Sequence, residues 1–324
     1  MHETMQKVAL GRTGYDVTRV ALGTYRFTNE FGVPRSDALA LLNSAISLGI
    51  NYMDTAPSYG NGESEELIGR VLRNNPNNRI FISSKVGLLQ RSIVPFSGDE
   101  AYVSEDCIRR VVEHSLWLLQ RDHLDMLFIH SPEEEIWRWD DKLDAPVLRV
   151  LEKLRDEKVI GAIGLGSNSA EFPSRLAETG RFDVVEIANG YTLLQQPIEK
   201  RLLPAALKHD IGIVAGGPFC DGMLAKVQYE KLEEFKRAGR HNSLLNERTL
   251  AMLGDYYRLS DESEISMNEL SLRYILSNPA IHTVIPGAQN PDEVEKNYSA
   301  GLKGPLPDDV LEEIGKIQRK AASL

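Results

Sequence analysis

Short apolar runs rich in Val and Ile recur along the chain, each 4 to 8 residues long and bounded by Gly, Pro or a polar residue. Such runs are typical of buried β-strands. They alternate with segments in which apolar residues recur every three or four positions, the pattern of amphipathic helices. The predicted strands cover residues 18–24, 50–55, 79–85, 124–130, 159–166, 182–189, 211–217 and 281–287, and the predicted helices cover residues 38–48, 65–72, 108–119, 147–158, 170–178, 201–209, 267–276 and 292–299.

The alternation of strands and helices predicts an α/β fold with a parallel sheet, because parallel neighbours need a crossover connection. Eight such units close into a (β/α)8 barrel, which takes about 250 residues. The chain has 324 residues, and we expect the surplus in a β-hairpin over residues 6–18, in long loops and in a terminal helix. Since no linker-like stretch divides the sequence, residues 1–324 are expected to form one domain.

Three predicted loops are too long to be simple connectors, namely residues 87–104, 131–145 and 219–246. All three follow strands, so a barrel would place them at its C-terminal face, where such folds bind substrates. Arg91, Trp137 and Trp139 in these loops are therefore candidates for substrate contact. For the two tryptophans, packing beneath their own loop is the alternative.

Composition and charge narrow the function classes. The net charge of −10 and the lack of a dense Lys/Arg cluster argue against a nucleic-acid partner. Cys107, Cys220 and the seven histidines do not occur at metal-ligand spacings, so no metal site is expected. The sequence shows no signal-peptide core and no apolar stretch of the ~18 residues that a membrane span needs, so we expect a cytoplasmic protein.

Four ionisable side chains stand at or just beyond the ends of three consecutive predicted strands. Asp54 ends the second strand and Tyr59 follows in its loop, while Lys85 ends the third strand and His130 the fourth. Because the ends of parallel strands meet at one rim of a barrel, we expect the four side chains to converge there. Each alone has an ordinary explanation as a satisfied group at a strand end. Together they indicate an active site.

These residue types form a specific chemical set. A phenol is a poor acid or base at neutral pH, but a neighbouring ammonium such as Lys85 favours the phenolate and is expected to lower the pKa of Tyr59. Asp54 in contact with Lys85 would keep the ammonium charged and in place. His130 can orient and polarise a substrate oxygen through a hydrogen bond.

The motifs around these residues, NYMDTAPSYG, FISSK and MLFIHSP, resemble those of the aldo-keto reductase superfamily. The resemblance runs from LGRTG in the predicted hairpin to GAQNPDEVEKN near the C-terminus, which is nearly the whole chain. It implies a (β/α)8 barrel that binds a nicotinamide cofactor and transfers a hydride between the cofactor and a carbonyl or alcohol carbon. Asp54, Tyr59, Lys85 and His130 would then be the catalytic residues, with Tyr59 transferring the proton and the cofactor supplying the redox chemistry.

The resemblance also implies contacts to the nicotinamide. Ser167 and Asn168 in GLGSNS correspond to the pair that holds its carboxamide in the family. The Gln that members commonly place on the sixth strand is replaced by Ala188. Asn189 is the candidate substitute, unless its side chain points the other way.

After the seventh predicted strand, Gly216 and Gly217 stand where many members stack an aromatic ring on the nicotinamide, so that stack is expected to be missing. The loop that follows resembles the one that wraps the pyrophosphate. The end of the first strand matches the GT-aromatic motif of the family, for which a simple strand-ending turn is the alternative. The further candidates for cofactor binding are Gly23, Thr24, Tyr25, Asp54, Pro218, Phe219, Gly222, Leu224, Lys226, Ile285, Gly287, Gln289 and Asn297, of which Tyr25 is also a candidate for substrate contact.

The segment IPGAQNPDEVEKN predicts the cofactor preference. NADP-dependent members have a Lys-Ser pair after IP and an Arg a few residues later, and here those positions hold Gly287, Ala288 and Glu293. A carboxylate repels an adenosine 2′-phosphate and can accept hydrogen bonds from a ribose hydroxyl, so NAD is expected over NADP. A solvated Glu293 at a helix start is the alternative interpretation.

The phrases EIANGYTLL, AGGPFCDG and VIPGAQNPDEVEKN resemble the NAD-linked aldose dehydrogenases of the superfamily, such as the D-threo-aldose (L-fucose) and L-galactose dehydrogenases. Those enzymes oxidise the anomeric hydroxyl of a cyclic aldose to a lactone, and the same reaction is expected here, with a sugar as the small-molecule partner. One alternative is an NAD(P)H-dependent aldehyde or ketone reductase with the same site. The other is a weakly catalytic, cofactor-sensing binding subunit. No predicted helix has a surplus apolar face that would indicate an oligomer.

Overall fold

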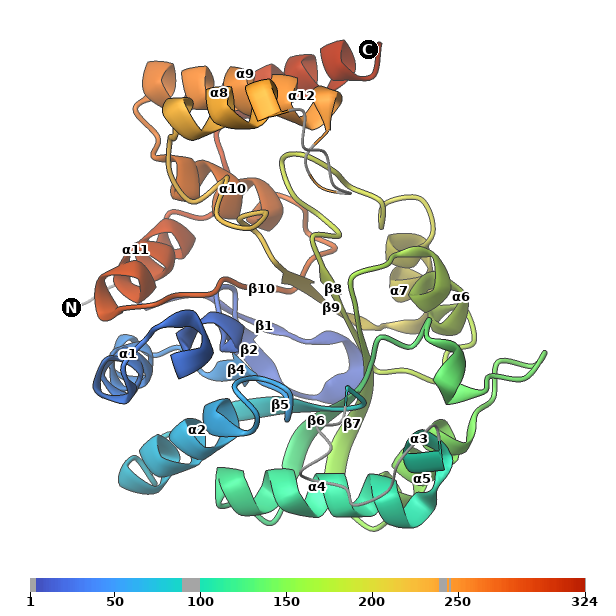
Figure 1. Cartoon of the computed structure of the whole chain (residues 1–324). Helices are drawn as coiled ribbons and strands as arrows, with labels where there is room; N and C mark the ends of the chain where they lie inside the picture. Colours follow the sequence, from blue (N-terminus) through green and yellow to red (C-terminus); the bar gives the residue numbers. More distant parts are fainter. Residues whose placement is uncertain (1–3, 89–99, 239–243, 245, 324) are drawn as a thin grey trace.

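The computed structural model describes residues 4–88, 100–238, 244 and 246–323. At its centre is an eight-stranded parallel sheet in which each strand pairs with the next along the chain. Parallel bridges between Val20 and Val284 and between Gly23 and Gly287 join the last strand to the first, so the sheet curls into a barrel (Figure 1). The strands are β3 (Leu22–Gly23), β4 (Tyr52–Asp54), β5 (Phe81–Val86), β6 (Leu124–His130), β7 (Ile160–Ser167), β8 (Val184–Ala188), β9 (Gly212–Gly216) and β10 (Thr283–Ile285).

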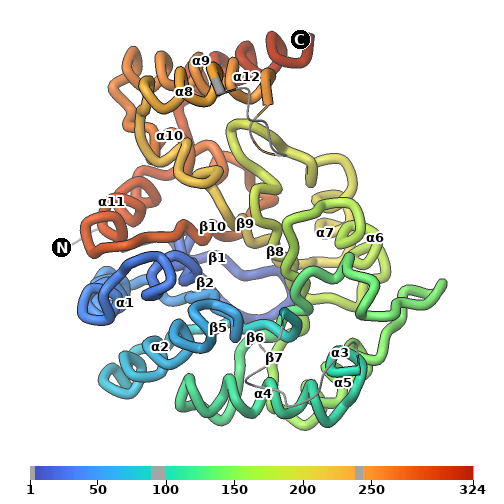
Figure 2. Tube along the Cα trace, viewed as in Figure 1, coloured from blue at the N-terminus to red at the C-terminus, as the bar shows by residue number. Residues whose placement is uncertain are grey.

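Helices occupy all the segments that the sequence predicts and surround the barrel, as Figure 2 shows. The predicted (β/α)8 fold is thus confirmed. These helices are α1 (Arg35–Leu48), α2 (Glu63–Asn74), α4 (Glu105–Leu119), α5 (Pro146–Asp156), α6 (Glu171–Ala177), α7 (Leu202–His209), α10 (Met267–Leu276) and α11 (Pro291–Leu302).

The local sequence explains several helix boundaries. Helix α1 ends at Gly49, whose φ of 91° lies in the left-handed region that glycine adopts without steric strain. Helix α5 begins with Pro146, which lacks the N–H that the first helical turn would leave unpaired. Helix α11 follows Asn290, whose side chain accepts a hydrogen bond from the backbone N–H of Glu293.

Further helices lie in the connections. They are α3 (Glu100–Val103), α8 (Tyr229–Ala238), α9 (Glu247–Ser263) and the expected terminal helix, α12 (Asp308–Ala321). Helices α8, α9 and α12 lie together at one side of the barrel, beyond α10 (Figures 1 and 2). The expectation of a long loop over residues 219–246 is therefore wrong for the part that forms α8. There Leu232 is buried, and Phe235 is partly buried against the hydrophobic core.

The predicted hairpin is present as β1 (Lys7–Ala9) and β2 (Asp16–Thr18), which pair antiparallel. It covers the N-terminal ends of the barrel strands. Leu10 between its strands is fully buried, and Arg12 donates hydrogen bonds to the backbone oxygens of Gly180 and Phe182. The barrel is therefore filled and closed at this end, which leaves the C-terminal ends of the strands for a site.

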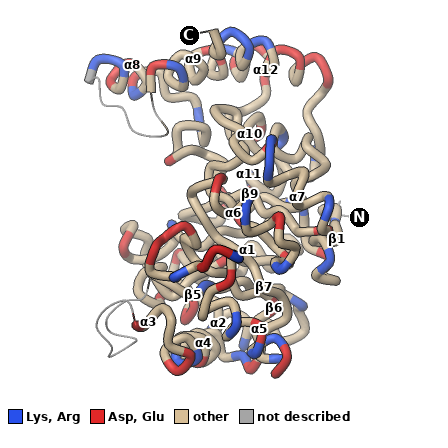
Figure 3. The backbone as a smooth tube through the Cα atoms, turned by 90° about the vertical axis from the view of Figure 1, so that its right-hand side faces the viewer, with Lys and Arg blue, Asp and Glu red and all other residues tan. Residues whose placement is uncertain are grey.

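Charged residues are spread over the outer helices. Figure 3 shows Lys and Arg interspersed with Asp and Glu on the side of the molecule that it presents. Within the described ranges, no helix combines the length and the apolar composition needed to cross a bilayer.

Candidate active site

Three of the predicted residues meet at the C-terminal rim of the barrel. Lys85 donates a 2.6 Å hydrogen bond from Nζ to Oδ2 of Asp54 and a 3.1 Å hydrogen bond to Oη of Tyr59. A third hydrogen bond, of 3.1 Å, goes to the backbone oxygen of Thr55. The side chains of Lys85 and Asp54 are only 1% and 2% exposed. A buried ammonium needs such a partner, so Asp54 fixes both the charge and the position of Lys85.

A second carboxylate lies against the same ammonium. Oε2 of Glu186, on β8, is 3.3 Å from Nζ of Lys85. Burial raises the pKa of Glu186 to about 7, with Asp54 adding to the rise and Lys85 opposing it. Although burial lowers the pKa of Lys85, the two carboxylates outweigh that effect and raise it well above its ordinary value. No role for Glu186 was predicted, yet a carboxylate inside the apolar run FDVVEIAN was a visible signal.

Gly216 leaves the space that Glu186 occupies. A Cβ at this position of β9 would come within 3.0 Å of Oε1 of Glu186 and 3.3 Å of Cα of Ala188. Glu186 and Ala188 share a face of β8, because side chains two residues apart on a strand point the same way. Gly216 and Ala188, the two small residues that stand in place of the aromatic ring and the Gln expected from the resemblance, therefore both lie next to the buried carboxylate of Glu186.

His130, at the end of β6, stands edge-on to Tyr59, with 6.4 Å between the ring centroids. Its Nδ1 is buried and has no hydrogen-bond partner in the described part of the chain. Burial, with a smaller effect of Lys85, lowers the pKa of His130 to about 3. The imidazole is therefore neutral at physiological pH and can form a hydrogen bond with a substrate oxygen.

The expected lowering of the pKa of Tyr59 is wrong. Burial of the phenol raises its pKa above the ordinary value, and this effect exceeds the lowering by Lys85. Asp54 and Glu186 add to the rise, because a phenolate would face two carboxylates. Tyr59 is therefore a neutral phenol at physiological pH.

A cleft of about 1750 Å³ opens over Asp54, Tyr59, Lys85 and His130 and extends to α10 and α11. Most of the predicted cofactor-binding residues line it. They are Gly23, Thr24, Tyr25, Asp54, Ser167, Asn168, Asn189, Gly216, Gly217, Pro218, Phe219, Gly222, Lys226, Ile285, Gly287, Gln289, Glu293 and Asn297. Leu224 was also expected to bind the cofactor, but its side chain is fully buried in the hydrophobic core and does not line the cleft.

The two tryptophans do not line the cleft either. Trp137 is 1% exposed and donates a 3.0 Å hydrogen bond from Nε1 to the backbone oxygen of Ser131. Trp139 donates one of 2.8 Å to the backbone oxygen of Pro132. Both pack beneath their own loop. This is the alternative that the sequence analysis gave to substrate contact. The third substrate candidate, Arg91, lies outside the described residues.

The polar groups along the cleft fit a nicotinamide cofactor. Oδ1 of Asn189 is buried next to Gly217 and has no hydrogen-bond partner among the residues described, so it is available to an amide N–H. Asn168 lines the cleft as well. Ser167 is less free, because its hydroxyl already donates to the carboxylate of Glu133 at 2.8 Å. Asn168 and Asn189 therefore present freer polar groups to the cleft than Ser167 does.

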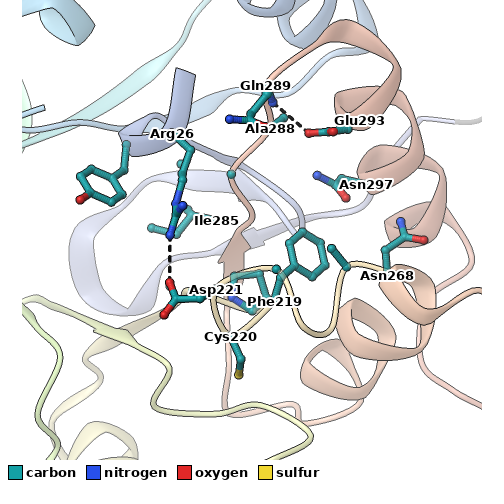
Figure 4. Close-up of a pocket in the computed structure, with 18 of the residues that line it drawn as sticks. Arg26, Phe219, Cys220, Asp221, Asn268, Ile285, Ala288, Gln289, Glu293 and Asn297 are labelled. Atoms are coloured by element: carbon teal, nitrogen blue, oxygen red, sulfur yellow. Dashed lines mark hydrogen bonds and ion pairs between the residues drawn. The ribbon is translucent and has the colours of Figure 1, made fainter. Parts of the chain in front are cut away.

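Two loops are joined across the cleft by an ion pair that was not predicted. Nη2 of Arg26, after β3, is 2.9 Å from Oδ1 of Asp221, after β9 (Figure 4). Both side chains line the cleft and are exposed. The pair connects the loops that follow β3 and β9, two strands with β10 between them in the barrel.

Glu293 has a structural contact in addition to its place in the cleft. Its carboxylate accepts a 2.9 Å hydrogen bond from the backbone N–H of Gln289 (Figure 4). It also accepts one of 3.2 Å from the side chain of Asn290, at the start of α11. These contacts are those of a helix cap. The helix-start role and the cofactor role of Glu293 are therefore compatible.

The barrel and its rim define a class of protein, the (β/α)8 enzymes that work in a cleft across the carboxyl ends of their strands. The model of the aldo/keto reductase family matches residues 19–319. The chain belongs to this family, and the resemblance seen in the motifs is confirmed. It is therefore an oxidoreductase of the kind that uses a nicotinamide cofactor.

Individual relatives are similar over nearly their whole length. The chain is 30% identical over 308 residues to the D-threo-aldose 1-dehydrogenase of a Pseudomonas species, covering 89% of this chain and 91% of that one. It is 28% identical over 338 residues to the pyridoxal 4-dehydrogenase of Microbacterium luteolum, covering 95% and 96%. Among solved structures, aldo-keto reductase AKR11C1 from Bacillus halodurans, in its holo form, has a TM-score of 0.76 and 25% identity over 97% of this chain and 96% of that one.

Proposed function

We propose that this protein oxidises the anomeric hydroxyl of a cyclic aldose to a lactone, with NAD as the hydride acceptor. The observation that carries the proposal is the 3.1 Å contact between Oη of Tyr59 and Nζ of Lys85 at the base of the cleft. The Pseudomonas relative, a D-threo-aldose 1-dehydrogenase, supports the substrate class.

In this proposal, Tyr59 exchanges a proton with the substrate hydroxyl. Lys85 stabilises the phenolate that must form, and Asp54 holds Lys85 in place through their 2.6 Å hydrogen bond. His130, neutral because of its burial, binds the substrate oxygen and orients it. A bound nicotinamide supplies the hydride acceptor.

Other residues of the cleft hold the cofactor in this proposal. Asn168 and Asn189 bind the carboxamide through their amide groups. The loop from Gly217 to Gly222 faces the pyrophosphate, and open space lies next to Gly222, where a Cβ would meet no atom within 4 Å. Glycine at such a place lets a backbone N–H approach a phosphate closely.

The preference for NAD is inferred from the charges of α11. The residues of this helix that line the cleft include the carboxylates Asp292, Glu293 and Glu295 and the cation Lys296. This excess of negative charge disfavours an adenosine 2′-phosphate, whereas a ribose hydroxyl can donate a hydrogen bond to a carboxylate.

A second candidate function is the reduction of an aldehyde or ketone by NAD(P)H at the same site. It is favoured by the raised pKa of Tyr59, because a neutral phenol is ready to donate a proton to a carbonyl oxygen. The two candidates differ in the direction of the reaction and not in the residues.

The test measures initial rates with a panel of aldoses plus NAD or NADP and with a panel of aldehydes plus NADH or NADPH. We expect the highest kcat/KM for an aldose with NAD. The variant Tyr59→Phe should lower kcat by about 10²- to 10⁴-fold, the usual contribution of a general acid or base. Tyr102→Phe, outside the cleft, is the control and should keep the wild-type rates.

Three results would count against the proposal. Faster reduction of carbonyls than oxidation of any aldose would favour the second candidate. A higher kcat/KM with NADP than with NAD would refute the inference from Glu293. A Tyr59→Phe variant that kept most of its turnover would remove Tyr59 from the chemistry in either direction.

A further inference from the structure

The two carboxylates at Lys85 have different surroundings. Asp54 accepts a hydrogen bond at each oxygen, from Oγ of Ser83 at 2.6 Å and from Nζ of Lys85 at 2.6 Å. Oε2 of Glu186 is buried without a hydrogen-bond partner in the described residues, although it lies 3.3 Å from Nζ. Hydrogen bonds stabilise the charged form of a carboxylate, whereas burial without them favours the protonated form. Glu186 is therefore the carboxylate that accepts a proton more readily.

The oxidation needs such an acceptor. Tyr59 is a neutral phenol with a raised pKa, and a neutral phenol cannot take a proton from an alcohol. Lys85 connects it to Glu186, since Nζ is 3.1 Å from Oη of Tyr59 and 3.3 Å from Oε2 of Glu186. The contact to Tyr59 is a hydrogen bond, whereas the contact to Glu186 is an ion pair, so the path from the phenol to the carboxylate is completed when an N–H of Lys85 turns toward Oε2.

We propose that Glu186 takes the phenolic proton of Tyr59 by way of Lys85, and thereby turns Tyr59 into the base of the oxidation. The inference rests on the proposed function. The O–H bond of Tyr59 breaks as an N–H bond forms on Lys85, while another N–H bond of Lys85 breaks as an O–H bond forms on Glu186. The products are a phenolate, the same ammonium and a neutral carboxylic acid, so protons and charge balance.

The rest of the cycle also balances. The phenolate would take the hydroxyl proton of the substrate, which restores the phenol, and a bound nicotinamide would supply the hydride acceptor. Glu186 lines the cleft, so its proton can leave to solvent. In carbonyl reduction the same path runs backwards, and Glu186 supplies the proton that replaces the one Tyr59 donates. Glu186 exchanges protons with Tyr59 through Lys85 and does not touch the substrate. It is therefore a positioning residue and not a catalytic one.

The pKa of Glu186 depends on the titratable groups that face its carboxylate. They are Tyr52 and Asp54 on β4, Tyr59 on the loop after β4, and Lys85 on β5. The neighbouring strands β7 and β9 present Gly166 and Gly216 to its carboxylate and no titratable side chain. Within the part of the chain that the structure describes, Lys85 is thus the cation that balances the charge of Glu186, in competition with Asp54.

The test compares the pH dependence of kcat for wild type, Glu186→Gln and Glu65→Gln. Wild-type oxidation should speed up as pH rises through about 7, where Glu186 loses its proton, and wild-type reduction should slow over the same range. Glu186→Gln should lose about tenfold or more in kcat for oxidation and should lose this pH dependence in both directions. Glu65→Gln is the matched control and should keep the wild-type profile. Glu65 is also buried, but it lies outside the cleft, and Lys85 has only a minor effect on its pKa.

A spectroscopic readout does not depend on turnover. In the Glu65→Gln background, infrared difference spectra should show the C=O band of a protonated, buried carboxylic acid as pH falls through about 7. The band should be missing in the double variant Glu65→Gln/Glu186→Gln. If both variants show the same spectra, the inference is overturned.

The outcomes separate this inference from the proposed function. If Tyr59→Phe abolishes aldose oxidation but Glu186→Gln retains the wild-type rate and pH profile, the relay is wrong and the proposed function stands. If the wild type reduces carbonyls only, and Glu186→Gln removes the pH dependence of that reduction, the relay stands and the proposed direction is wrong.

Discussion

Glu65, a second buried carboxylate, shows what burial does to a single residue in this protein. It lies on α2, fully buried, and one of its oxygens accepts a 2.7 Å hydrogen bond from Oγ of Ser84 on β5. The other oxygen has no hydrogen-bond partner among the residues that the structure describes. Burial therefore raises the pKa of Glu65 to about 7, despite the opposing effect of this hydrogen bond.

A raised pKa makes stability depend on pH. Between the unfolded pKa of about 4.3 and about 7, folded Glu65 holds a proton that the unfolded chain has lost, so the free energy of unfolding falls as pH rises through this window. A glutamine does not titrate, so its contribution to the free energy of unfolding does not fall with rising pH. We expect Glu65→Gln to gain stability relative to wild type between about pH 5 and pH 8, by at most about 3 kcal/mol. Urea denaturation of both proteins at the two pH values measures this, and a difference that does not change with pH would contradict it.

The chemical identity of the site was predictable at the residue scale, but its electrostatics were not. Asp54, Lys85 and His130 stand out because polar residues end otherwise apolar strands, and parallel strands bring such ends together. The pKa of Tyr59 was predicted in the wrong direction, because the sequence shows which charge is near but not how deeply a ring is buried. Glu186 was missed, although its charge interrupts an apolar strand.

At the scale of elements, the start of α11 combines helix capping with the proposed recognition of the cofactor. Glu293→Arg should raise the ratio of kcat/KM for NADP over NAD by about tenfold, equivalent to about 1.4 kcal/mol, because it replaces a repulsive charge by an attractive one. Kinetics with both cofactors measure the ratio. Glu293→Gln is the control, since an amide oxygen can still accept the hydrogen bond from the N–H of Gln289. It should change the ratio less, and an unchanged ratio in Glu293→Arg would leave Glu293 as a cap only.

The periodicity of the sequence predicted the repeating elements well and the inserted ones poorly. Each predicted strand and helix of the barrel is present. Continuous apolar runs mark strands that are buried on both faces, and an apolar stripe marks helices that are buried on one. Helices α8 and α9, between β9 and α10, were not predicted. These two helices lie outside the alternation of strand and helix. The apolar side of α8, with Leu232, packs against α9 rather than against the sheet. Tertiary contact, not local pattern, determines such insertions.

At the scale of the whole molecule, the two ends of the barrel have different tasks. The proposed chemistry is at the C-terminal ends of the strands, where the cleft opens. The opposite end is closed by the hairpin, through Leu10 and the hydrogen bonds of Arg12. That residues 1–324 form one domain stays a prediction.

This separation can be tested at Leu10, which is fully buried at the closed end and packs directly on Gly212, where an added Cβ would come within 2.7 Å of its Cγ. Leu10→Ala should lower the free energy of unfolding by about 2–5 kcal/mol, because it removes buried methyl groups and leaves a cavity. Its kcat/KM, measured well below the unfolding temperature, should stay at the wild-type value, since Leu10 lies among the residues at the far end of the barrel from the cleft. Val8→Ala, on the same hairpin but only partly buried, should destabilise less. A large loss of kcat/KM in Leu10→Ala without a loss of stability would show that the closed end influences the geometry of Asp54, Tyr59 and Lys85.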